Sequence, residues 1–172
     1  MIDDSELLAR AEAYAKSRDA EVVRKERLGH GSDGAVWRTT RNSAVKAFAR
    51  QVSYLSELEC YRRLQNQGIR HLGEFDVPRL EGFDDDLMVI EMSIVRPPFL
   101  LDFGKVYLDQ APEYWSDPEV VAAWNADKEE IFGPENWMRV RRVIAALRRF
   151  GIFYVDPRPS NINLGEDADD RL

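Results

Sequence analysis

Residues 27–48, RLGHGSDGAVWRTTRNSAVKAF, decide the fold of the first half of the chain. Two runs within this stretch, GAVWRTT and SAVKAF, alternate small, β-branched and aromatic residues with polar ones, as half-buried strands do. Arg-Asn-Ser separates these two runs, and a glycine-rich turn separates them from a third strand-like run, AEVVRKERLG, at 20–29. The pattern predicts a meander of three antiparallel strands.

Apolar residues on either side of the meander follow a helical period at some positions and a strand period at others. Helical spacing predicts helices over 5–17, 52–66, 119–131 and 135–150. Strand-like runs occupy 76–82 and 87–92, with the FDDD segment between them as a turn, and Pro97-Pro98 ends this region. We therefore expect an α+β protein: a five-stranded antiparallel sheet with one helix inserted after its third strand, then a reduced, mainly helical part.

Composition limits the classes of protein to consider. The chain has 172 residues, of which 44% are hydrophobic, and this suits one domain or two small lobes. A net charge of −7 argues against general binding to nucleic acid or to an anionic membrane. The single cysteine, Cys60, and the acidic start, MIDDSE, lead us to expect a cytoplasmic protein without a signal peptide or a membrane span.

The glycines of LGHGSDGAV have the spacing G-x-G-x-x-G at Gly29, Gly31 and Gly34, with Val36 following. Glycine allows backbone N–H groups to approach phosphate oxygens closely. A dinucleotide-binding fold has the same spacing but opens a helix directly after it, whereas these glycines lie between two strand-like runs. By itself, the motif is equally well interpreted as a glycine-rich hairpin turn.

Three further motifs follow in order along the chain. Ala44-Val45-Lys46 is a strand with a lysine that alternates away from its apolar neighbours, and SELECYRRL places Glu57 on the same helix face as Tyr61 and Leu64. Near the end, DPRPSNI matches D-x-[KR]-P-x-N at Asp156, Arg158 and Asn161. Without the other motifs, an exposed strand lysine and a proline-rich turn would explain the first and the last.

Taken together over residues 27–164, these motifs resemble those of the protein-kinase-like phosphotransferases. The resemblance implies an N-lobe at 19–95, preceded by a helix at 1–18, and a reduced C-lobe at 96–172 that carries the catalytic loop. ATP and Mg²⁺ are the implied cofactors, with ATP phosphates beneath the glycines and adenine against a hinge at Glu91–Ser93. Tyr154-Val155 replaces the family's His-Arg, so regulation through a phosphorylated activation loop is not expected.

The resemblance also implies a role for each matched residue. Lys46, held by Glu57, would contact the α- and β-phosphates. Asp156 would orient the acceptor hydroxyl and take its proton, while Arg158 would neutralise charge on the γ-phosphoryl group and Asn161 would bind the metal. The predicted reaction transfers the γ-phosphoryl group of ATP to a hydroxyl acceptor.

The second metal-binding carboxylate of that family lies in a D-F-G triplet after the catalytic loop, but here D-F-G precedes the loop. FLLDFGK at 99–105 contains it, so Asp102 is the candidate metal ligand. We expect FLLDF to pair beside INL at 162–164. An ordinary Asp-Phe-Gly turn is the alternative interpretation of this segment, and an acid among Asp167, Asp169 and Asp170 is another candidate ligand.

Several questions stay open at the level of sequence. The acceptor could be a protein serine or threonine or a small molecule, and Trp115, Trp124 and Trp137 could line its site or belong to the core. A pseudokinase-type module that binds nucleotide or a partner without catalysis is the alternative function. A homodimer could cover apolar surface of so small a C-lobe. The arginines at 139, 141, 142, 148 and 149 form either a solvated helix face or a binding patch.

Overall fold

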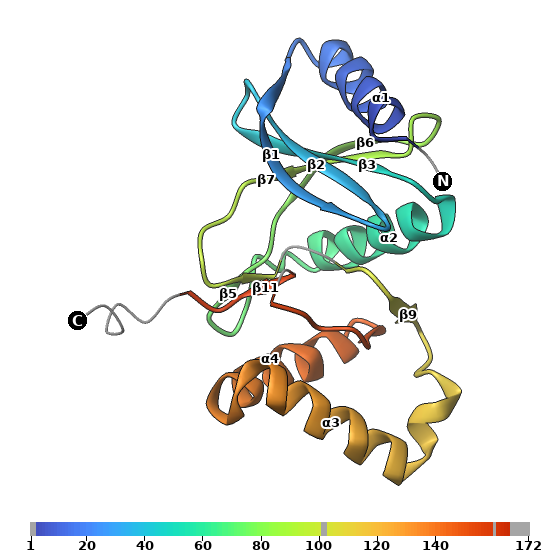
Figure 1. The fold of residues 1–172 in the computed structure, drawn as a ribbon, viewed down its shortest axis with the longest axis vertical. Helices are drawn as coiled ribbons and strands as arrows, with labels where there is room; N and C mark the ends of the chain where they lie inside the picture. Colours follow the sequence, from blue (N-terminus) through green and yellow to red (C-terminus); the bar gives the residue numbers. More distant parts are fainter. Residues whose placement is uncertain (1–2, 101–102, 160, 166–172) are drawn as a thin grey trace, which may run out of the picture. The chain divides into compact units, whose positions relative to one another are not determined.

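The computed structural model describes residues 3–100, 103–159 and 161–165. The described residues form two compact units (Figure 1). The first unit is drawn from Met1–Gly68 and Pro78–Ile94, and the second from Ile69–Val77 and Val95–Leu172.

A five-stranded antiparallel sheet forms the centre of the first unit, with the strand order β1-β2-β3-β7-β6. Its strands are β1 (Val22–Gly31), β2 (Gly34–Thr39), β3 (Ser43–Phe48), β6 (Leu80–Asp84) and β7 (Val89–Ser93). Helix α2 (Gln51–Asn66) follows β3 in the chain. The predicted α+β class is confirmed, as is a five-stranded antiparallel sheet with one helix after its third strand.

Helix α1 (Asp4–Ser17) and helix α2 cover opposite faces of this sheet (Figure 1). The α1 face buries a cluster of apolar side chains from the helix and from three strands: Leu7, Ala11, Tyr14, Ala35, Trp37, Val45, Ala47 and Val89. Strand residues alternate between faces, so Lys46, between Val45 and Ala47, belongs to the α2 face. The sheet thereby separates its apolar α1 side from the side on which Lys46 lies.

A polar network is buried within the α1 face. The Tyr14 hydroxyl donates to one carboxylate oxygen of Glu91 at 3.0 Å, and the Ser43 hydroxyl donates to the other at 2.6 Å. Gly82 passes directly beneath the Tyr14 hydroxyl, where a Cβ atom would overlap it. Burial and the neighbouring Glu91 charge raise the pKa of Tyr14, which therefore stays protonated and keeps its donor role.

The predicted strand at 76–82 is wrong in its position. Strand β6 begins at Leu80, two residues after Pro78, because proline has no N–H to donate to a ladder. Phe75 and Asp76 form the separate strand β5 of the second unit. The FDDD turn also shifts: Phe83 and Asp84 belong to β6, and the chain reverses over 85–88, where the Leu87 N–H donates to the Asp84 carboxylate at 2.8 Å.

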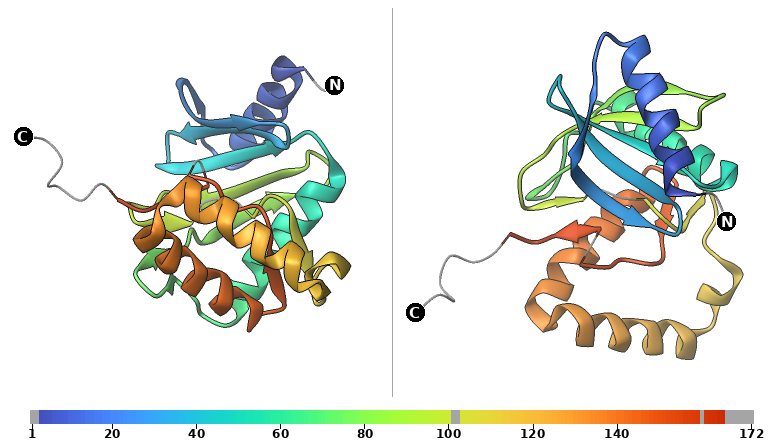
Figure 2. Two further views of the ribbon diagram at one scale, coloured as in Figure 1. Left: turned by 60° about the horizontal axis from the view of Figure 1, so that its bottom comes forward. Right: turned by 45° about the horizontal axis from the view of Figure 1, so that its top comes forward.

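The second unit contains two helices that pack side by side (Figure 2). They are α3 (Pro118–Phe132) and α4 (Pro134–Arg148), joined at Gly133, which has a φ of 76°. At this junction the Trp137 ring stacks on Phe132, with centroids 6.0 Å apart, and meets the Trp124 ring edge to face at 5.2 Å. Arg139 of α4 forms a bidentate ion pair with Glu74 at 2.8 and 3.0 Å, which anchors the helix to the hairpin beside it.

Short strand pairs complete the second unit. Strand β8 (Phe99–Leu100) pairs antiparallel with β11 (Ile162–Asn163), and β9 (Val106–Leu108) pairs antiparallel with β10 (Ile152–Tyr154). The hairpin of β4 (His71–Leu72) and β5 (Phe75–Asp76) extends the β8 sheet. The predicted pairing of FLLDF with INL is confirmed for Phe99–Leu100 and Ile162–Asn163. None of the helices in the described ranges has the length and apolarity needed to cross a membrane.

Candidate functional site in two parts

Three of the predicted site residues of the first unit lie in one row across the sheet. Gly29 of β1 is opposite Val36 of β2, Val36 is opposite Lys46 of β3, and Lys46 is opposite Ile90 of β7. Residues directly opposite each other in a ladder project to the same face. Gly29, Val36 and Lys46 therefore line the α2 face together, although 17 positions separate the first from the last.

Lys46 and Glu57 form a buried ion pair. The Lys46 Nζ atom lies 2.7 Å from Glu57 Oε2, and the two side chains are 5% and 2% exposed. The Phe48 ring also faces the ammonium group, with its centroid 4.7 Å from Nζ. Glu59, the other acid of this helix segment, pairs with Arg63 and is 40% exposed. The structure therefore brings Lys46 together with Glu57, the acid predicted from the helix face.

The three glycines of the motif differ in what surrounds them. A Cβ atom on Gly34 would overlap the Ala47 carbonyl oxygen, and Gly34 has a φ of 153°. The packing of β2 on β3 thus already requires glycine at position 34. A Cβ on Gly31 would meet nothing within 4 Å, and one on Gly29 would make an ordinary contact with Val36 at 3.7 Å. The chain leaves open space beside Gly31, which fits an approaching anion such as a phosphate.

The β1–β2 hairpin that carries these glycines is tied to the start of α2. Asp33, in the two-residue turn, accepts hydrogen bonds from Arg50 and from the Ser53 hydroxyl, the latter at 2.9 Å. Its carbonyl oxygen also accepts from the Ala49 N–H at 2.9 Å. These contacts fix the hairpin tip relative to the helix that supplies Glu57.

The predicted hinge residues have other partners for their side chains. The Glu91 carboxylate lies on the α1 face, where Tyr14 and Ser43 donate to it, and this is the face opposite Lys46. The Ser93 hydroxyl accepts a hydrogen bond from the Arg79 N–H at 2.9 Å. A ligand on the α2 face would therefore meet the main chain of this strand rather than the carboxylate of Glu91.

In the second unit, Asp156 follows β10 and lies among three cations. Its Oδ2 atom is 2.8 Å from Arg158 Nη2 and 3.0 Å from Lys105 Nζ, and its Oδ1 atom is 3.9 Å from Lys128 Nζ. Burial by itself raises the pKa of Asp156, but the hydrogen bonds and charges of Lys105 and Arg158 outweigh burial. The pKa is therefore held below its ordinary value of 3.8, and the carboxylate is ionised at neutral pH.

Sequence reasoning missed Lys105 and Lys128. Lys105 stands directly after the D-F-G triplet, where the motif gave no reason to assign it a role. Lys128 carried a signal, because it follows Trp124 by four residues and precedes Phe132 by four, on the apolar face of its helix. Its side chain is 10% exposed and also lies 3.0 Å from Asp127.

The loop after Asp156 closes as a tight turn before β11. The N–H groups of Asn161 and Ile162 both donate to the Arg158 carbonyl oxygen at 2.9 Å. On the other side of Asp156, the Val155 carbonyl oxygen accepts a hydrogen bond from the Trp124 indole N–H at 2.9 Å. Helix α3 and this turn together hold the segment that carries Asp156 and Asn161.

Strand β8 pairs with β11, and β9 pairs with β10. The segment from β8 to β9 and the segment from β10 to β11 therefore connect the same two strand pairs. This pairing makes the segments neighbours, as the 3.0 Å Lys105–Asp156 ion pair demonstrates. Asp102 belongs to the first segment by sequence but lies outside the described residues, as do Asp167, Asp169 and Asp170. Among the described residues, no three His, Cys, Asp or Glu side chains gather as a metal-ligand group.

Chemically, the two parts supply different functions. The first has a buried ammonium group, paired with Glu57, on the same sheet face as Gly29, and a lysine can bind phosphate as a point charge. The second offers an ionised carboxylate and an amide side chain on one short loop, which suit proton transfer and the binding of a hard cation.

No protein-family model, curated protein or solved structure matches this chain.

Proposed function

We propose that this chain is an ATP-dependent phosphotransferase of the protein-kinase-like type, which moves the γ-phosphoryl group of ATP to a hydroxyl acceptor. The observation that carries this proposal is the buried Lys46–Glu57 pair, 2.7 Å between Nζ and Oε2, in the same sheet row as Gly29 and Val36. A strand lysine held by a helix glutamate is the phosphate-positioning device of kinases. Two motifs 11 residues apart in sequence meet here as that reaction requires.

The second unit supports the chemical half of the proposal. Asp156 is ionised at neutral pH, so it can accept the proton of an acceptor hydroxyl. As the hydroxyl oxygen forms its bond to the γ-phosphorus, the bond from that phosphorus to the bridging oxygen breaks and ADP leaves. Arg158 and Lys105, which contact the same carboxylate oxygen, bring positive charge to the place where phosphoryl charge develops.

Mg²⁺ is the cofactor this reaction needs, and when bound it neutralises charge on the phosphate oxygens. Asn161 and Asp102 are the residues we assign to it. The shared strand framework supports Asp102, because β8 leads into the segment that contains it and pairs beside Asn163, two residues after Asn161. One carboxylate and one amide are enough, since Mg²⁺ commonly takes its other ligands from water and substrate phosphates.

A thermal-shift measurement with ATP, with and without Mg²⁺, tests the proposal. The wild-type midpoint is expected to rise with ATP and to rise further with Mg²⁺, since a ligand at 100 times its Kd stabilises by about 2.7 kcal/mol. In Asp102→Asn, the metal-dependent part of the rise should disappear, with the midpoint of the ligand-free protein unchanged. Asp86→Asn, in the exposed turn between β6 and β7, is the matched loss of a carboxylate.

Each outcome of this measurement bears on a separate part of the proposal. No response to ATP in the wild type would overturn the assignment as a phosphotransferase. An equal response with and without metal would favour a nucleotide-binding module without catalysis. A normal Mg²⁺ response in Asp102→Asn would remove Asp102 from the metal site while leaving the nucleotide site intact.

A further inference from the structure

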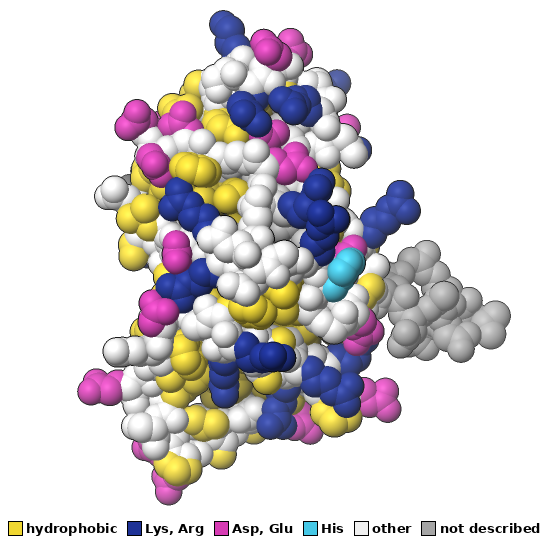
Figure 3. Space-filling model, turned by 180° about the vertical axis from the view of Figure 1, so that it is seen from behind, with side chains coloured by type: hydrophobic (Ala, Val, Ile, Leu, Met, Phe, Trp, Pro, Cys, Tyr) yellow, Lys and Arg dark blue, Asp and Glu magenta, His cyan; other side chains and the backbone are white. Residues whose placement is uncertain are grey.

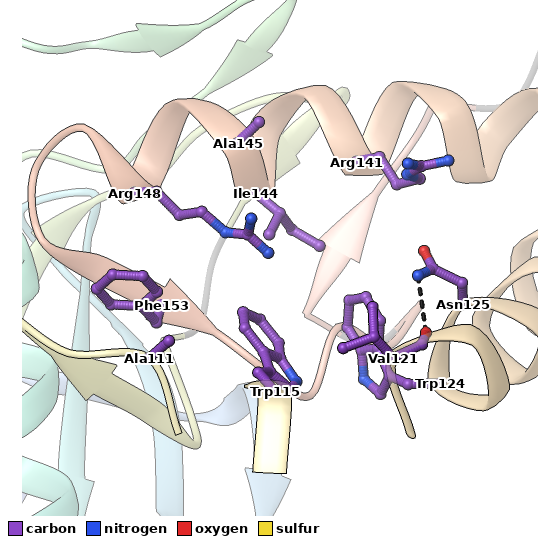
Figure 4. Close-up of a pocket in the computed structure, with 10 residues that line it drawn as sticks. All are labelled: Ala111, Trp115, Val121, Trp124, Asn125, Arg141, Ile144, Ala145, Arg148 and Phe153. Atoms are coloured by element: carbon purple, nitrogen blue, oxygen red, sulfur yellow. Dashed lines mark hydrogen bonds between the residues drawn. The ribbon is translucent and has the colours of Figure 1, made fainter. Parts of the chain in front are cut away.

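A pocket of about 370 Å³ opens between the two helices of the second unit (Figure 4). Helix α4 supplies one wall, α3 supplies another, and the short helix η1 (Glu113–Ser116) and strand β10 complete it. The lining residues are Ala111, Trp115, Val121, Trp124, Asn125, Arg141, Ile144, Ala145, Arg148 and Phe153. Its volume falls within the range of sites that bind small molecules.

The charges of this pocket all have one sign. Arg141 and Arg148 are seven residues apart on α4, so both project from the same face of the helix. The ten lining residues include no carboxylate, and within the described part of the chain neither guanidinium pairs with one. In Figure 3, Lys and Arg side chains stand beside hydrophobic ones on the surface of the second unit. The pocket thus has two exposed cations and no carboxylate among the residues that line it.

Aromatic rings form the apolar part of the pocket. Trp115 and Trp124 lie with ring centroids 5.4 Å apart, and the Arg148 guanidinium lies 4.8 Å from the centre of the Trp115 ring (Figure 4). The Trp115 indole N–H is shielded from solvent, and no acceptor for it is present among the described residues. Because solvent does not reach this nitrogen, a ligand in the pocket would meet the face of the Trp115 ring rather than its N–H.

Asn125 adds a polar group in a fixed orientation. Its amide nitrogen donates to the Val121 carbonyl oxygen at 2.8 Å, a bond drawn in Figure 4. The amide oxygen and the second N–H of Asn125 take no part in that bond. The pocket combines two guanidinium groups, one amide group and the tilted rings of Trp115 and Trp124.

We propose that this pocket binds a small aromatic anion, independently of the phosphotransferase function. The guanidinium groups match the paired oxygens of a carboxylate or a phosphate, and the indole rings match a planar apolar body. A neutral aromatic molecule would leave the cations unpaired, and an inorganic anion would leave the tryptophan surface uncovered. The aromatic ring and the negative charge are therefore both required.

Calorimetric titration of the full chain with three probes tests this site. Indole-3-acetate and phenyl phosphate carry a ring and an anion, whereas indole-3-acetamide carries the ring without the charge. Saturable binding is expected for at least one anion, and the stronger of the two identifies the carboxylate or the phosphate as the natural anionic group. Binding of the amide as tight as that of both anions, or no saturable binding of either anion at millimolar concentration, would overturn the proposal.

Variants on one helix provide the matched comparison. Arg141→Met and Arg148→Met should each weaken binding of the anion about tenfold, as the loss of a charged hydrogen bond does. Arg142→Met removes an equally exposed arginine that does not line the pocket, so its affinity should equal that of the wild type. Trp115→Leu removes the aromatic ring that the Arg148 guanidinium faces, and it should also bind more weakly. Equal affinities in the Arg141, Arg142 and Arg148 variants would contradict the site.

Discussion

At the scale of single residues, the Lys46–Glu57 pair, to which we assign a role in phosphate binding, is also a structural feature. Each side chain is at most 5% exposed, so each charge has been removed from water. Removing one partner of such a pair usually costs about 3–5 kcal/mol, because the other charge stays buried, whereas replacing both by apolar groups is often neutral. The two effects can therefore be separated by comparing a single variant with a double variant.

We predict that Lys46→Met lowers the free energy of unfolding by about 3–5 kcal/mol and that Lys46→Met/Glu57→Leu recovers most of this loss. The double variant should nevertheless show no response to ATP, because it lacks the ammonium group that we propose binds phosphate. Chemical denaturation measures the first effect and thermal shift the second. A double variant that is less stable than the single variant would contradict the paired-charge account.

The second prediction at this scale concerns the titration of Asp156. Its depressed pKa means that its ion pairs stabilise the fold above the unfolded pKa, and that this stability is lost as pH falls through the folded pKa. In Lys105→Met/Arg158→Met, burial is no longer outweighed by these two cations, so the pKa should rise. Carboxyl ¹³C NMR, assigned with Asp156→Asn, measures this shift.

The consequence for catalysis has a definite sign. In the wild type, protonation of Asp156 should not reduce turnover until pH falls below 3.8. In the double variant, the fall in turnover rate on the acid side of the pH profile should move to higher pH. Lys16→Met, an exposed substitution on α1, serves as the control for the loss of a cation. An unchanged Asp156 pKa in the double variant would show that the two cations do not control it.

At the scale of secondary-structure elements, glycine is needed at Gly34 of the β1–β2 hairpin for packing, but packing does not require it at Gly31. Gly34→Ala should destabilise the protein by about 1–3 kcal/mol, because its Cβ would overlap the Ala47 carbonyl oxygen. Gly31→Ala should leave stability unchanged within about 0.5 kcal/mol, because its Cβ would meet nothing, but should weaken ATP binding by filling the open space. Denaturation and nucleotide titration of both variants measure these effects.

The reverse pattern would contradict this division of roles. If Gly31→Ala destabilised the fold and left ATP binding intact, the motif would be a hairpin turn without a role toward phosphate. That interpretation is the one the glycine spacing leaves open when considered alone.

At the scale of the whole molecule, the sequence predicted the features that depend on local periodicity. Four helices, the meander and the helix after its third strand follow from spacings of two, three and four residues. The Lys46–Glu57 contact was predictable because strand alternation and helix faces fix directions. Strand β6 begins at Leu80, later than its periodicity predicts, because Pro78 has no N–H to donate to a ladder.

The features that sequence could not provide depend on contacts between distant segments. Lys105 meets Asp156 across 51 positions only because two separate strand pairs fix the same two loops. Likewise, the ladder register places Glu91 of β7 opposite Val45 of β3. Its carboxylate therefore lies on the α1 face, and a shift of one residue would move it to the other face. No local pattern contains this information.

Mg²⁺-dependent release of ADP from ATP, with water as the acceptor, tests the central claim most directly when the wild type is compared with Asp156→Asn. Both proteins should bind ATP, because Asp156 acts on the acceptor rather than on the nucleotide. We predict metal-dependent turnover by the wild type and a loss of about 10²–10⁴-fold in Asp156→Asn, the usual contribution of a general base. Equal turnover by the two proteins, or no metal-dependent turnover by the wild type, would contradict the account.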